Sequence, residues 1–401
     1  MYYSASPDRR GEIGIRGMDE VKGISILGST GSIGTNTLDV IRQHRDLFQV
    51  ITLAAGRNLP LLYKQIEEFR PKRVAVATKE LADELRTQLV HPPEILYGEE
   101  GLIACATHGE VEFVVAALVG FTGLAPTLAA IEAGKDIGLA NKETLVAAGH
   151  LVMEAVKRNG VRLLPIDSEH SAIFQSLQGE RREDIFRILL TASGGAFREK
   201  RREELKNVTV EEALKHPNWK MGAKITLDSA TMMNKGFEVI EAHWLFSLPY
   251  SSIDVVLHYE SILHSMVEFV DGAIIGQLGT PDMRIPIQYA LTYPVRIPLQ
   301  GGRLNLSQIG QLTFREVDVE RYPALSLAYE AGEQGGTYPT VLNAANETAV
   351  QSVLARRLPF YRIEEVVAKV LERHSSISHP SLTDILEADR WAREEAQNMI
   401  G

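Results

Sequence analysis

The sequence predicts an α/β protein: an N-terminal doubly wound parallel sheet, a central α/β region and a helical C-terminal region. Three observations lead to this prediction. From residue 23 to residue 166, short apolar runs alternate with segments of helical periodicity, as in parallel sheets covered by helices. A glycine-rich turn joins the first apolar run to the first helical segment. Residues 319–401 carry mainly helical periodicity.

Composition and charge exclude several classes of protein. A chain of 401 residues is long enough for two or three domains, and its net charge of −10 argues against nucleic-acid binding by bulk electrostatics. The longest apolar stretch, residues 114–120, is far too short to span a bilayer, and the polar N-terminus lacks a secretory signal. Cys105 is the only cysteine, which favours a reducing compartment. We therefore expect a soluble, cytoplasmic protein with no nucleic-acid or membrane partner.

The first strand and the first helix enclose a glycine-rich turn. The strand is expected at residues 23–27 and the helix at residues 35–43, and Gly28, Gly31 and Gly34 lie between them. Glycine lets a pyrophosphate approach the backbone closely, and free amides at the start of the helix can bind it. We interpret the turn as a nucleotide-binding loop.

The second strand, residues 50–55, ends in Gly56, Arg57 and Asn58. Sites that prefer NAD usually carry an acidic residue in this neighbourhood, whereas an arginine suits the 2′-phosphate of NADP. Taken alone, Arg57 can equally be a solvated loop residue. Together with the glycine turn it favours NADP.

The alternation continues and predicts a Rossmann-like sheet. Further strands are expected at residues 73–77, 112–117, 136–139 and 161–166, and helices at residues 80–89, at residues 124–133 and up to about residue 157. Ligands of such sheets bind beyond the carboxyl ends of the strands, where Asn141, Lys142 and Glu143 follow one strand. A helix cap for Asn141 and a solvated side chain for Lys142 are the simpler alternatives.

The next strand end has the sequence PIDSEHSAIFQ, which places Asp167, Ser168, Glu169 and His170 between a strand and a helix. These residues can cap the helix. Alternatively, Asp167 and Glu169 point the same way along an extended backbone and bind a hard cation. The segment by itself favours capping, which is the commoner role.

Two loops of the second half suit a phosphate ligand and a lid. A strand at residues 186–191 leads into Ser193, Gly194 and Gly195, which either hold a phosphate or form an ordinary tight turn. In HPNWKMG the large aromatic Trp219 lies in a polar loop. It either packs locally or belongs to a lid that closes over a ligand.

A helix expected to begin at Ser229 carries a third polar cluster. Asn234 and Glu238 share one face of this helix, with Lys235 beside them. Such spacing usually means a surface ion pair of little energetic value. The functional alternative makes Glu238 a ligand. His264, in an apolar strand pattern, is by itself more often a core histidine.

If the functional alternatives hold, Asp167, Glu169 and Glu238 form an oxygen-only set of ligands. Such a set suits Mg²⁺ or Mn²⁺ better than zinc.

Prolines and glycines between residues 281 and 302 indicate a connection between domains. Beyond it, helices are expected at residues 324–333, 342–356, 363–373 and 383–399. We expect a polar tail (1–20), a nucleotide-binding domain (21–166), a catalytic domain (167–292), a linker (293–318) and a helical domain (319–401).

These segments resemble the 1-deoxy-D-xylulose 5-phosphate reductoisomerase family. The resemblance covers residues 22 to about 400 in the family's order, and only the first 20 residues depart from it. The DSEH and DSATMMNKG segments are highly specific. The matching segments are GSTGSIG, AGRN, LANKE, PIDSEHSAIFQ, TASGGAFRE, HPNWKMG, ITLDSATMMNKGFEVIEAHWLF, ILHSMV, LGTPDMR and LNAANE.

The resemblance implies a two-step reaction. A divalent metal, Mn²⁺ or Mg²⁺ with Co²⁺ as an alternative, helps rearrange the carbon skeleton of 1-deoxy-D-xylulose 5-phosphate. NADPH then reduces the branched aldehyde to 2-C-methyl-D-erythritol 4-phosphate in the non-mevalonate route to isoprenoids. The resemblance also implies a homodimer.

The resemblance further implies the site residues. The metal ligands are Asp167, Glu169 and Glu238, and the catalytic residues are Lys142, Ser168, Glu169 and Glu238. The substrate-binding residues are Ser193, His216, Trp219, Met221, Ser229, Asn234, Lys235 and His264, of which Trp219 and Met221 belong to the lid. The cofactor-binding residues are Gly28, Thr30, Gly31, Ser32, Ile33, Gly56, Arg57, Asn58, Asn141, Glu143 and Gly222.

Two other functions compete with this one. Another metal-using NADP oxidoreductase, such as a semialdehyde or homoserine dehydrogenase, shares the cofactor loop. A semialdehyde dehydrogenase needs a cysteine nucleophile, however, and Cys105 lies in an apolar context. A non-catalytic NADPH sensor would not need three carboxylates.

Overall fold

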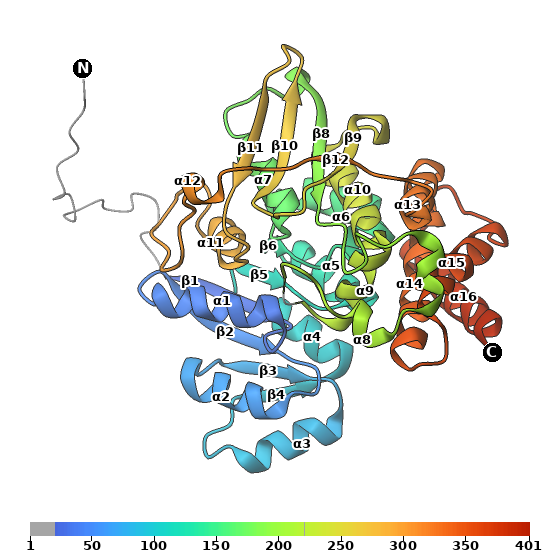
Figure 1. The fold of residues 1–401 in the computed structure, drawn as a ribbon. Coiled ribbons are helices and arrows are strands. Elements are labelled where there is room, and N and C mark those ends of the chain that lie inside the picture. The colour runs from blue at the N-terminus through green and yellow to red at the C-terminus, as the bar shows by residue number, and fades with distance from the viewer. Residues whose placement is uncertain (1–20, 220) are drawn as a thin grey trace, which may run out of the picture.

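The computed structural model describes residues 21–219 and 221–401 and confirms the predicted α/β class. The tail expected at residues 1–20 lies outside the described residues. Figure 1 shows a first sheet in blue and cyan, a second sheet at the opposite end in green to orange, and the C-terminal helices to one side of both. No helix in the described parts of the chain has both the length and the apolar character needed to cross a bilayer.

The first sheet has seven parallel strands in the order β4-β3-β2-β1-β5-β6-β7. The order reverses between β1 and β5, the position at which such sheets bind ligands. Its strands are β1 (Lys22–Leu27), β2 (Phe48–Ala54), β3 (Arg73–Val76), β4 (Glu94–Tyr97), β5 (Phe113–Ala116), β6 (Asp136–Leu139) and β7 (Leu163–Pro165). The connecting helices are α1 (Ser32–Gln43), α2 (Leu59–Phe69), α3 (Lys79–Gln88), α4 (Gly98–Ala106), η1 (Gly120–Gly123), α5 (Leu124–Glu132) and α6 (Glu143–Asn159).

Four of these elements, α2, β4, α4 and the short η1, were not expected from the sequence. Strand β4 is an edge strand of four residues, and its two end residues, Glu94 and Tyr97, are exposed. So short and half-exposed a segment has almost no apolar run from which to predict a strand.

The second sheet is mixed, in the order β11-β10-β8-β9-β12, and only β8 and β9 are parallel. Its strands are β8 (Ile185–Ala192), β9 (Ile253–Leu257), β10 (Leu263–Phe269), β11 (Ile274–Leu278) and β12 (Arg315–Glu316). The helices of this part are α7 (Ser168–Ser176), η2 (Arg182–Asp184), η3 (Arg202–Asn207), α8 (Val210–Ala213), α9 (Ala223–Thr231), α10 (Met233–Phe246), η4 (Tyr250–Ser252), α11 (Arg284–Thr292) and α12 (Leu306–Ile309).

The single helix predicted from Ser229 onward is wrong. Met232 has φ +67°, a left-handed conformation, and it ends α9 and precedes α10. The sequence gives no warning of this break, because glycine or asparagine usually occupies such a position. The break places Ser229, near the end of α9, and Asn234, in the first turn of α10, around one cavity.

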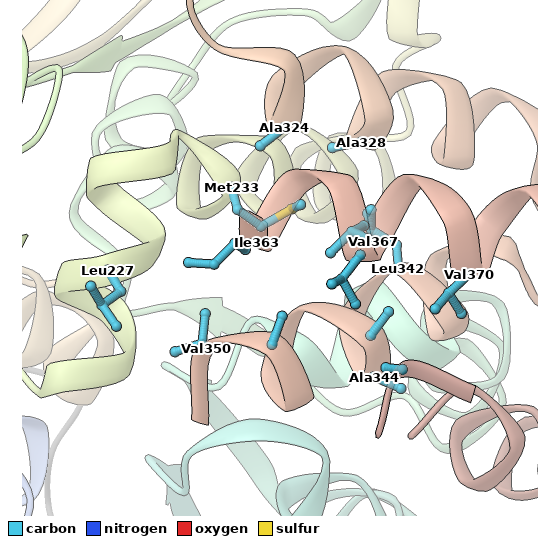
Figure 2. Packing of buried hydrophobic residues seen from close by; sticks show 14 of the residues in the cluster. Leu227, Met233, Ala324, Ala328, Leu342, Ala344, Val350, Ile363, Val367 and Val370 are labelled. Carbon is cyan, nitrogen blue, oxygen red and sulfur yellow. The ribbon is translucent and has the colours of Figure 1, made fainter. Parts of the chain in front are cut away.

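The C-terminal helices correspond to the four that were predicted and pack on the helices that carry the site. In Figure 2, Leu227 of α9 and Met233 of α10 lie in one buried cluster with Leu342, Val350 and Val367. The C-terminal helices are α13 (Pro323–Gln334), α14 (Tyr338–Leu354), η5 (Phe360–Arg362), α15 (Ile363–Glu372) and α16 (Leu382–Ile400).

Helix α11 contributes to the core of the first sheet. Its residues Ile287, Ala290 and Leu291 are buried in the same cluster as Ile24 and Val115 of that sheet. The chain therefore returns to the N-terminal sheet after forming β8 to β11, before it adds β12 to the second sheet.

Candidate active site

A cavity enclosing about 1100 Å³, partly open to solvent, lies between the carboxyl edge of the first sheet and the second sheet. Turns after β6, β7 and β8, the segment before α9, and helices α9 and α10 all contribute side chains to it. The predicted residues that line it are Ser32, Ile33, Lys142, Asp167, Ser168, Glu169, Ser193, His216, Trp219, Met221, Gly222, Ser229, Asn234, Lys235, Glu238 and His264.

Three carboxylates converge at one end of the cavity. One oxygen each of Asp167, Glu169 and Glu238 lies within 4.8 Å of the other two. Asp167 is the N-cap residue of α7 and Glu169 lies in its first turn, as the capping alternative expects, but the Asp167 side chain makes no capping hydrogen bond. The extended backbone assumed for the pair is wrong, since Glu169 is already in the first turn of α7. The resulting donor set of oxygen atoms alone is the one that hard divalent cations prefer.

Two buried lysines neutralise part of this negative charge. Lys142 Nζ contacts the Asp167 carboxylate and lies 3.0 Å from both Glu238 Oε1 and Asn234 Oδ1. Lys235 Nζ lies 2.8 Å from Glu169 Oε1 and also contacts Glu238. The two lysines are 7% and 4% exposed, so neither the solvated side chain nor the surface ion pair is correct. With all three carboxylates ionised, they and the two ammonium groups leave one net negative charge, which favours a cation.

Burial and neighbouring charges shift the pKa values of Glu169 and Asp167 in opposite directions. Burial and the neighbouring Glu238 raise the pKa of Glu169 to about 7. Burial also opposes ionisation of Asp167, but the Lys142 ammonium outweighs it and holds the pKa of Asp167 well below its usual range. A cation bound here would compete with the proton on Glu169.

A buried pair, His170 and Glu241, lies next to the carboxylate cluster and contacts the backbone of Glu238. Neither residue was assigned a role from the sequence. His170 Nε2 donates to the backbone oxygen of Glu238 over 2.9 Å, and its Nδ1 lies 3.3 Å from Glu241 Oε2. Both side chains are fully buried, and burial raises the pKa of Glu241 to about 7. The only signal in the sequence was the presence of His170 in the DSEH segment.

At the other end of the cavity, Ser193 and His216 are arranged to meet an anion. His216 Nδ1 accepts the Trp219 amide hydrogen over 2.9 Å, so its proton is on Nε2, which lies 2.9 Å from Ser193 Oγ. The Gly195 amide also donates to Ser193 Oγ, over 3.3 Å. With Oγ accepting twice, the hydroxyl proton of Ser193 is free for a ligand. Burial and Arg198 lower the pKa of His216 to about 4, which keeps it neutral.

The loop after β8 is both a tight turn and a wall of the cavity. Gly194 and Gly195 have φ values of +79° and +70°, and a Cβ on Gly195 would lie 2.5 Å from the Ser229 backbone oxygen. The two alternatives left open by the sequence are therefore compatible. The turn needs glycine in order to pack against α9 beside Ser229.

The segment carrying Trp219 lies over the cavity. The Trp219 and His264 ring centroids are 6.1 Å apart. Asn218 Nδ2 donates to the Tyr259 backbone oxygen over 2.6 Å and to Ser261 Oγ over 2.7 Å. The segment is thus joined to the loop between β9 and β10, as a closed lid would be.

The glycine turn leaves the start of α1 open. Gly31 is the N-cap of α1 and supplies no side-chain cap, and the next two residues, Ser32 and Ile33, line the cavity. Gly28 has φ +96°, and a Cβ there would lie 2.3 Å from the Ala117 backbone oxygen. The amides of the first turn are therefore available to a phosphate group.

The other predicted cofactor residues lie outside the cavity wall. Arg57 is exposed after β2, and the Asn58 side chain caps α2 by accepting from the Leu61 amide over 3.3 Å. Asn141 and Glu143 are buried and hydrogen-bonded to each other over 2.8 Å. The predicted residues that do not line the cavity are Gly28, Thr30, Gly31, Gly56, Arg57, Asn58, Asn141 and Glu143.

Several residues that line the cavity were not predicted. Most present backbone or apolar atoms, which carry no recognisable pattern in the sequence. His258 is polar, but its Nε2 accepts the Ile262 and Leu263 amides over 3.2 and 3.1 Å and so supports the loop. These residues are Ala140, Thr191, Ala192, Ile225, Met232, His258, Ser261, Leu263 and Met283.

Three family models match the chain. The model described as 1-deoxy-D-xylulose 5-phosphate reductoisomerase matches residues 24–149, and the model of that enzyme's C-terminal domain matches residues 163–246. A third, described as the DXP reductoisomerase C-terminal domain, matches residues 278–395.

Relatives and solved structures agree with these matches. The 1-deoxy-D-xylulose 5-phosphate reductoisomerase of Halalkalibacterium halodurans is 59% identical over 95% of this chain and 100% of its own length. That of Exiguobacterium sibiricum is 60% identical over 93% of this chain and 97% of its own.

The solved structure of the Zymomonas mobilis enzyme in complex with NADPH is similar with a TM-score of 0.89 and 42% identity, covering 95% of this chain and 99% of that chain. A DOX-P reductoisomerase in complex with NADPH, fosmidomycin and magnesium has a TM-score of 0.89 and 41% identity, covering 95% and 98%. The chain belongs to the 1-deoxy-D-xylulose 5-phosphate reductoisomerase family.

Proposed function

We propose that the chain converts 1-deoxy-D-xylulose 5-phosphate to 2-C-methyl-D-erythritol 4-phosphate, using NADPH and a divalent metal, in isoprenoid precursor biosynthesis. The observation that carries the proposal is the cluster of Asp167, Glu169 and Glu238 in a cavity that also reaches the start of α1. One cavity thus joins a site for a hard cation to a site for a nucleotide. The solved relatives named above bind NADPH and magnesium.

The carboxylate end suits rearrangement of the ketose. Asp167, Glu169 and Glu238 would hold the metal, which when bound supplies Lewis-acid polarisation of the substrate carbonyl and holds a neighbouring hydroxyl in place. Mg²⁺ and Mn²⁺ both suit these oxygen ligands, with Co²⁺ as an alternative. Lys142 would place a positive charge where negative charge develops on the substrate oxygens. Ser168, whose hydroxyl donates to Glu169, would orient that ligand.

The opposite end suits the phosphate of the substrate. Ser193 would donate its free hydroxyl proton to the phosphate. Ser229, together with Asn234 and Lys235 from the carboxylate end, would bind the remaining phosphate and hydroxyl oxygens. The lid residues Trp219 and Met221, with His264 facing Trp219, would exclude water during reduction.

The cofactor would lie along the carboxyl edge of the first sheet. The open first turn of α1 would bind its pyrophosphate, and Arg57 its 2′-phosphate. NADPH when bound supplies the hydride for the second step. The domain limits expected from the sequence, with a nucleotide-binding part at 21–166 and a catalytic part at 167–292, belong to this proposal.

The proposal includes a homodimer in the cytoplasm. Strand β11 is the outer strand of the second sheet, and its side chains Ile274, Ile275 and Leu278 are 53%, 40% and 39% exposed. An apolar sheet edge of this kind favours pairing with another strand. Sedimentation at micromolar concentration is expected to give twice the mass of the chain, and a monomer would exclude the dimer. The buried free thiol of Cys105 agrees with a reducing compartment.

NADPH oxidation tests the activity. Adding 1-deoxy-D-xylulose 5-phosphate and Mn²⁺ to the protein is expected to oxidise NADPH, followed by its absorbance. Chelator is expected to stop the oxidation and fresh metal to restore it. If NADPH binds but is not oxidised under these conditions, the activity is wrong and a sensor or another aldehyde substrate takes its place.

A further inference from the structure

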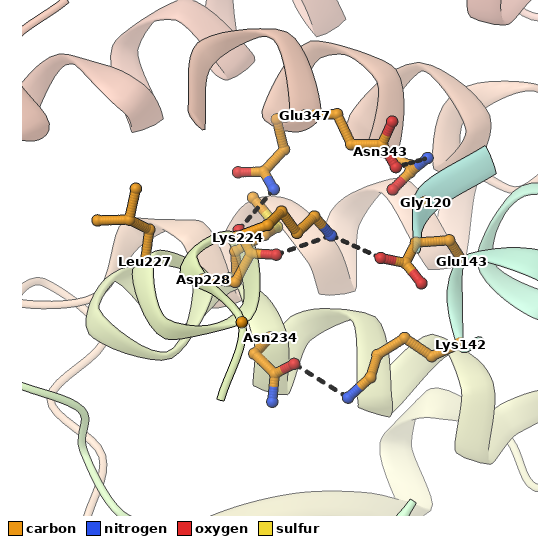
Figure 3. A network of polar contacts seen from close by, with 12 residues as sticks. Gly120, Lys142, Glu143, Lys224, Leu227, Asp228, Asn234, Asn343 and Glu347 are labelled. Carbon is orange, nitrogen blue, oxygen red and sulfur yellow. Dashed lines mark hydrogen bonds and ion pairs between the residues drawn. The ribbon is translucent and has the colours of Figure 1, made fainter. Parts of the chain in front are cut away.

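A buried network of polar side chains links the C-terminal helices to the cofactor side of the site. It runs from Asn346 on α14, through Asp228 and Lys224 on α9, to Glu143 at the start of α6 and Asn141 in the turn before it. Figure 3 shows its middle part, in which Lys224 lies between Asp228 and Glu143. All five side chains belong to residues that are at most 7% exposed. Asn346 lies in the LNAANE segment, to which no role had been assigned.

Each carboxylate in this polar network has a hydrogen-bond or ion-pair partner at both of its oxygens. Asn346 Nδ2 donates to Asp228 Oδ1 over 2.8 Å, and Asp228 Oδ2 lies 2.8 Å from Lys224 Nζ. Lys224 Nζ lies 2.7 Å from Glu143 Oε1, while Asn141 Nδ2 donates to Glu143 Oε2 over 2.8 Å. The orientations of both carboxylates are therefore determined by partners on three different helices or turns.

Lys224 is the central member. Besides its two carboxylates it faces the Phe237 ring, with Nζ 4.9 Å from the ring centroid. Burial disfavours its charge, but Asp228 and Glu143 outweigh this and raise the pKa of Lys224 above its usual value. A buried ammonium with two carboxylate partners holds them in one geometry, since loss of any partner leaves an uncompensated charge.

Lys224 lies between the lid segment and the residues at the start of α6. It is in the first turn of α9, which follows the lid residue Met221 and the N-cap Gly222, and the Thr226 amide donates to the Gly222 oxygen over 3.0 Å. Its partner Glu143 follows Lys142, which contacts the carboxylate cluster. Asn141 Nδ2 also donates to the Gly120 backbone oxygen over 3.0 Å, which holds the turn after β5.

We propose that Lys224 is a positioning residue for the cofactor, and that Asn346 and Asp228 make helix α14 part of this positioning. This polar network holds Glu143 and the end of the lid in the arrangement that binds NADPH. The C-terminal helices thus contribute to cofactor affinity through contacts that do not touch the cofactor. This inference rests on the proposed function and on the cofactor-binding role that the family resemblance implies for Glu143.

The Asn346→Ala variant of the full-length protein tests the inference, because it removes one hydrogen bond and leaves no buried ammonium unpaired. We expect NADPH to bind roughly tenfold or more weakly, by analogy with the loss of metal affinity when the hydrogen-bond partners of metal-binding side chains are removed. The KM for NADPH should rise by the same factor, while kcat at saturating NADPH stays within about threefold. Binding is measured by the change in NADPH fluorescence, without turnover.

Ser352→Ala is the matched control. Ser352 lies on the same helix, is 1% exposed, and its hydroxyl has no hydrogen-bond partner among the described residues. Its NADPH affinity should equal that of the wild type. If Asn346→Ala binds NADPH within twofold of wild type, the inference is wrong. Should that variant not fold, Asp228→Asn, which keeps the shape of the side chain, replaces it under the same criterion.

A double variant separates positioning from a general loss of stability. If the polar network acts as one unit, the double variant Lys224→Met with Asn346→Ala should bind NADPH no more weakly than Lys224→Met alone. Independent, multiplying effects would contradict the inference. Wild-type turnover, measured in parallel, separates failure of the proposed function from failure of this inference. If the wild type shows no turnover, the proposed function is refuted. If the wild type turns over normally and Asn346→Ala keeps its NADPH affinity, only the positioning role is refuted.

Discussion

The Glu238→Gln variant is expected to lose metal-dependent turnover by about a thousandfold and to keep its affinity for NADPH. Glu238 is 1% exposed, and its carboxylate lies with those of Asp167 and Glu169 in the oxygen cluster. A unit charge about 4 Å away, at an effective dielectric constant of roughly 20, contributes ~4 kcal/mol. That energy corresponds to about a thousandfold in affinity, and Gln removes the charge while keeping the shape.

The measurement for Glu238→Gln is Mn²⁺ affinity by calorimetry, together with NADPH oxidation and NADPH binding. Glu372→Gln, an exposed change at the end of α15, serves as the control and should behave as wild type. Full turnover of Glu238→Gln would refute its assignment as a ligand. Loss of NADPH binding would show that the substitution disturbs the fold rather than the metal site.

The Lys142→Met variant is expected to lose turnover by about 10²–10³-fold while binding the metal as tightly as wild type or more tightly. Lys142 Nζ lies among Asp167, Glu238 and Asn234 and is nearly inaccessible to solvent. Removing its charge makes the carboxylates more attractive to a cation. It also removes a preorganised positive charge from the reacting end, and donors of this kind contribute factors of that size.

Lys142→Met and Glu238→Gln therefore form a pair with opposite effects on metal affinity and similar effects on turnover. Lys369→Met, an exposed change on α15, controls for the loss of a lysine. Weaker metal binding by Lys142→Met would contradict the electrostatic argument. Unchanged turnover would exclude Lys142 from the reaction.

Much of the fold was predictable because local patterns and tertiary packing agree. The apolar runs of the first sheet are buried on both faces, and Gly28 must be glycine because a side chain would collide with Ala117. Strand β4 was not predicted because this short edge strand buries few apolar side chains. The break at Met232 was not predicted because a methionine rarely takes a left-handed conformation.

The sequence by itself determined the family and the α/β class, and it predicted 16 of the residues that line the cavity, because these depend on residue identity and order along the chain. It did not decide between a cap and a ligand at Asp167, or between a surface pair and a buried one at Lys235 and Glu238. Those choices depend on burial and on partners far away in the chain, such as Lys142. The link from Asn346 to Glu143 likewise exists only once α14 packs against α9, because no local pattern records which buried polar groups will meet.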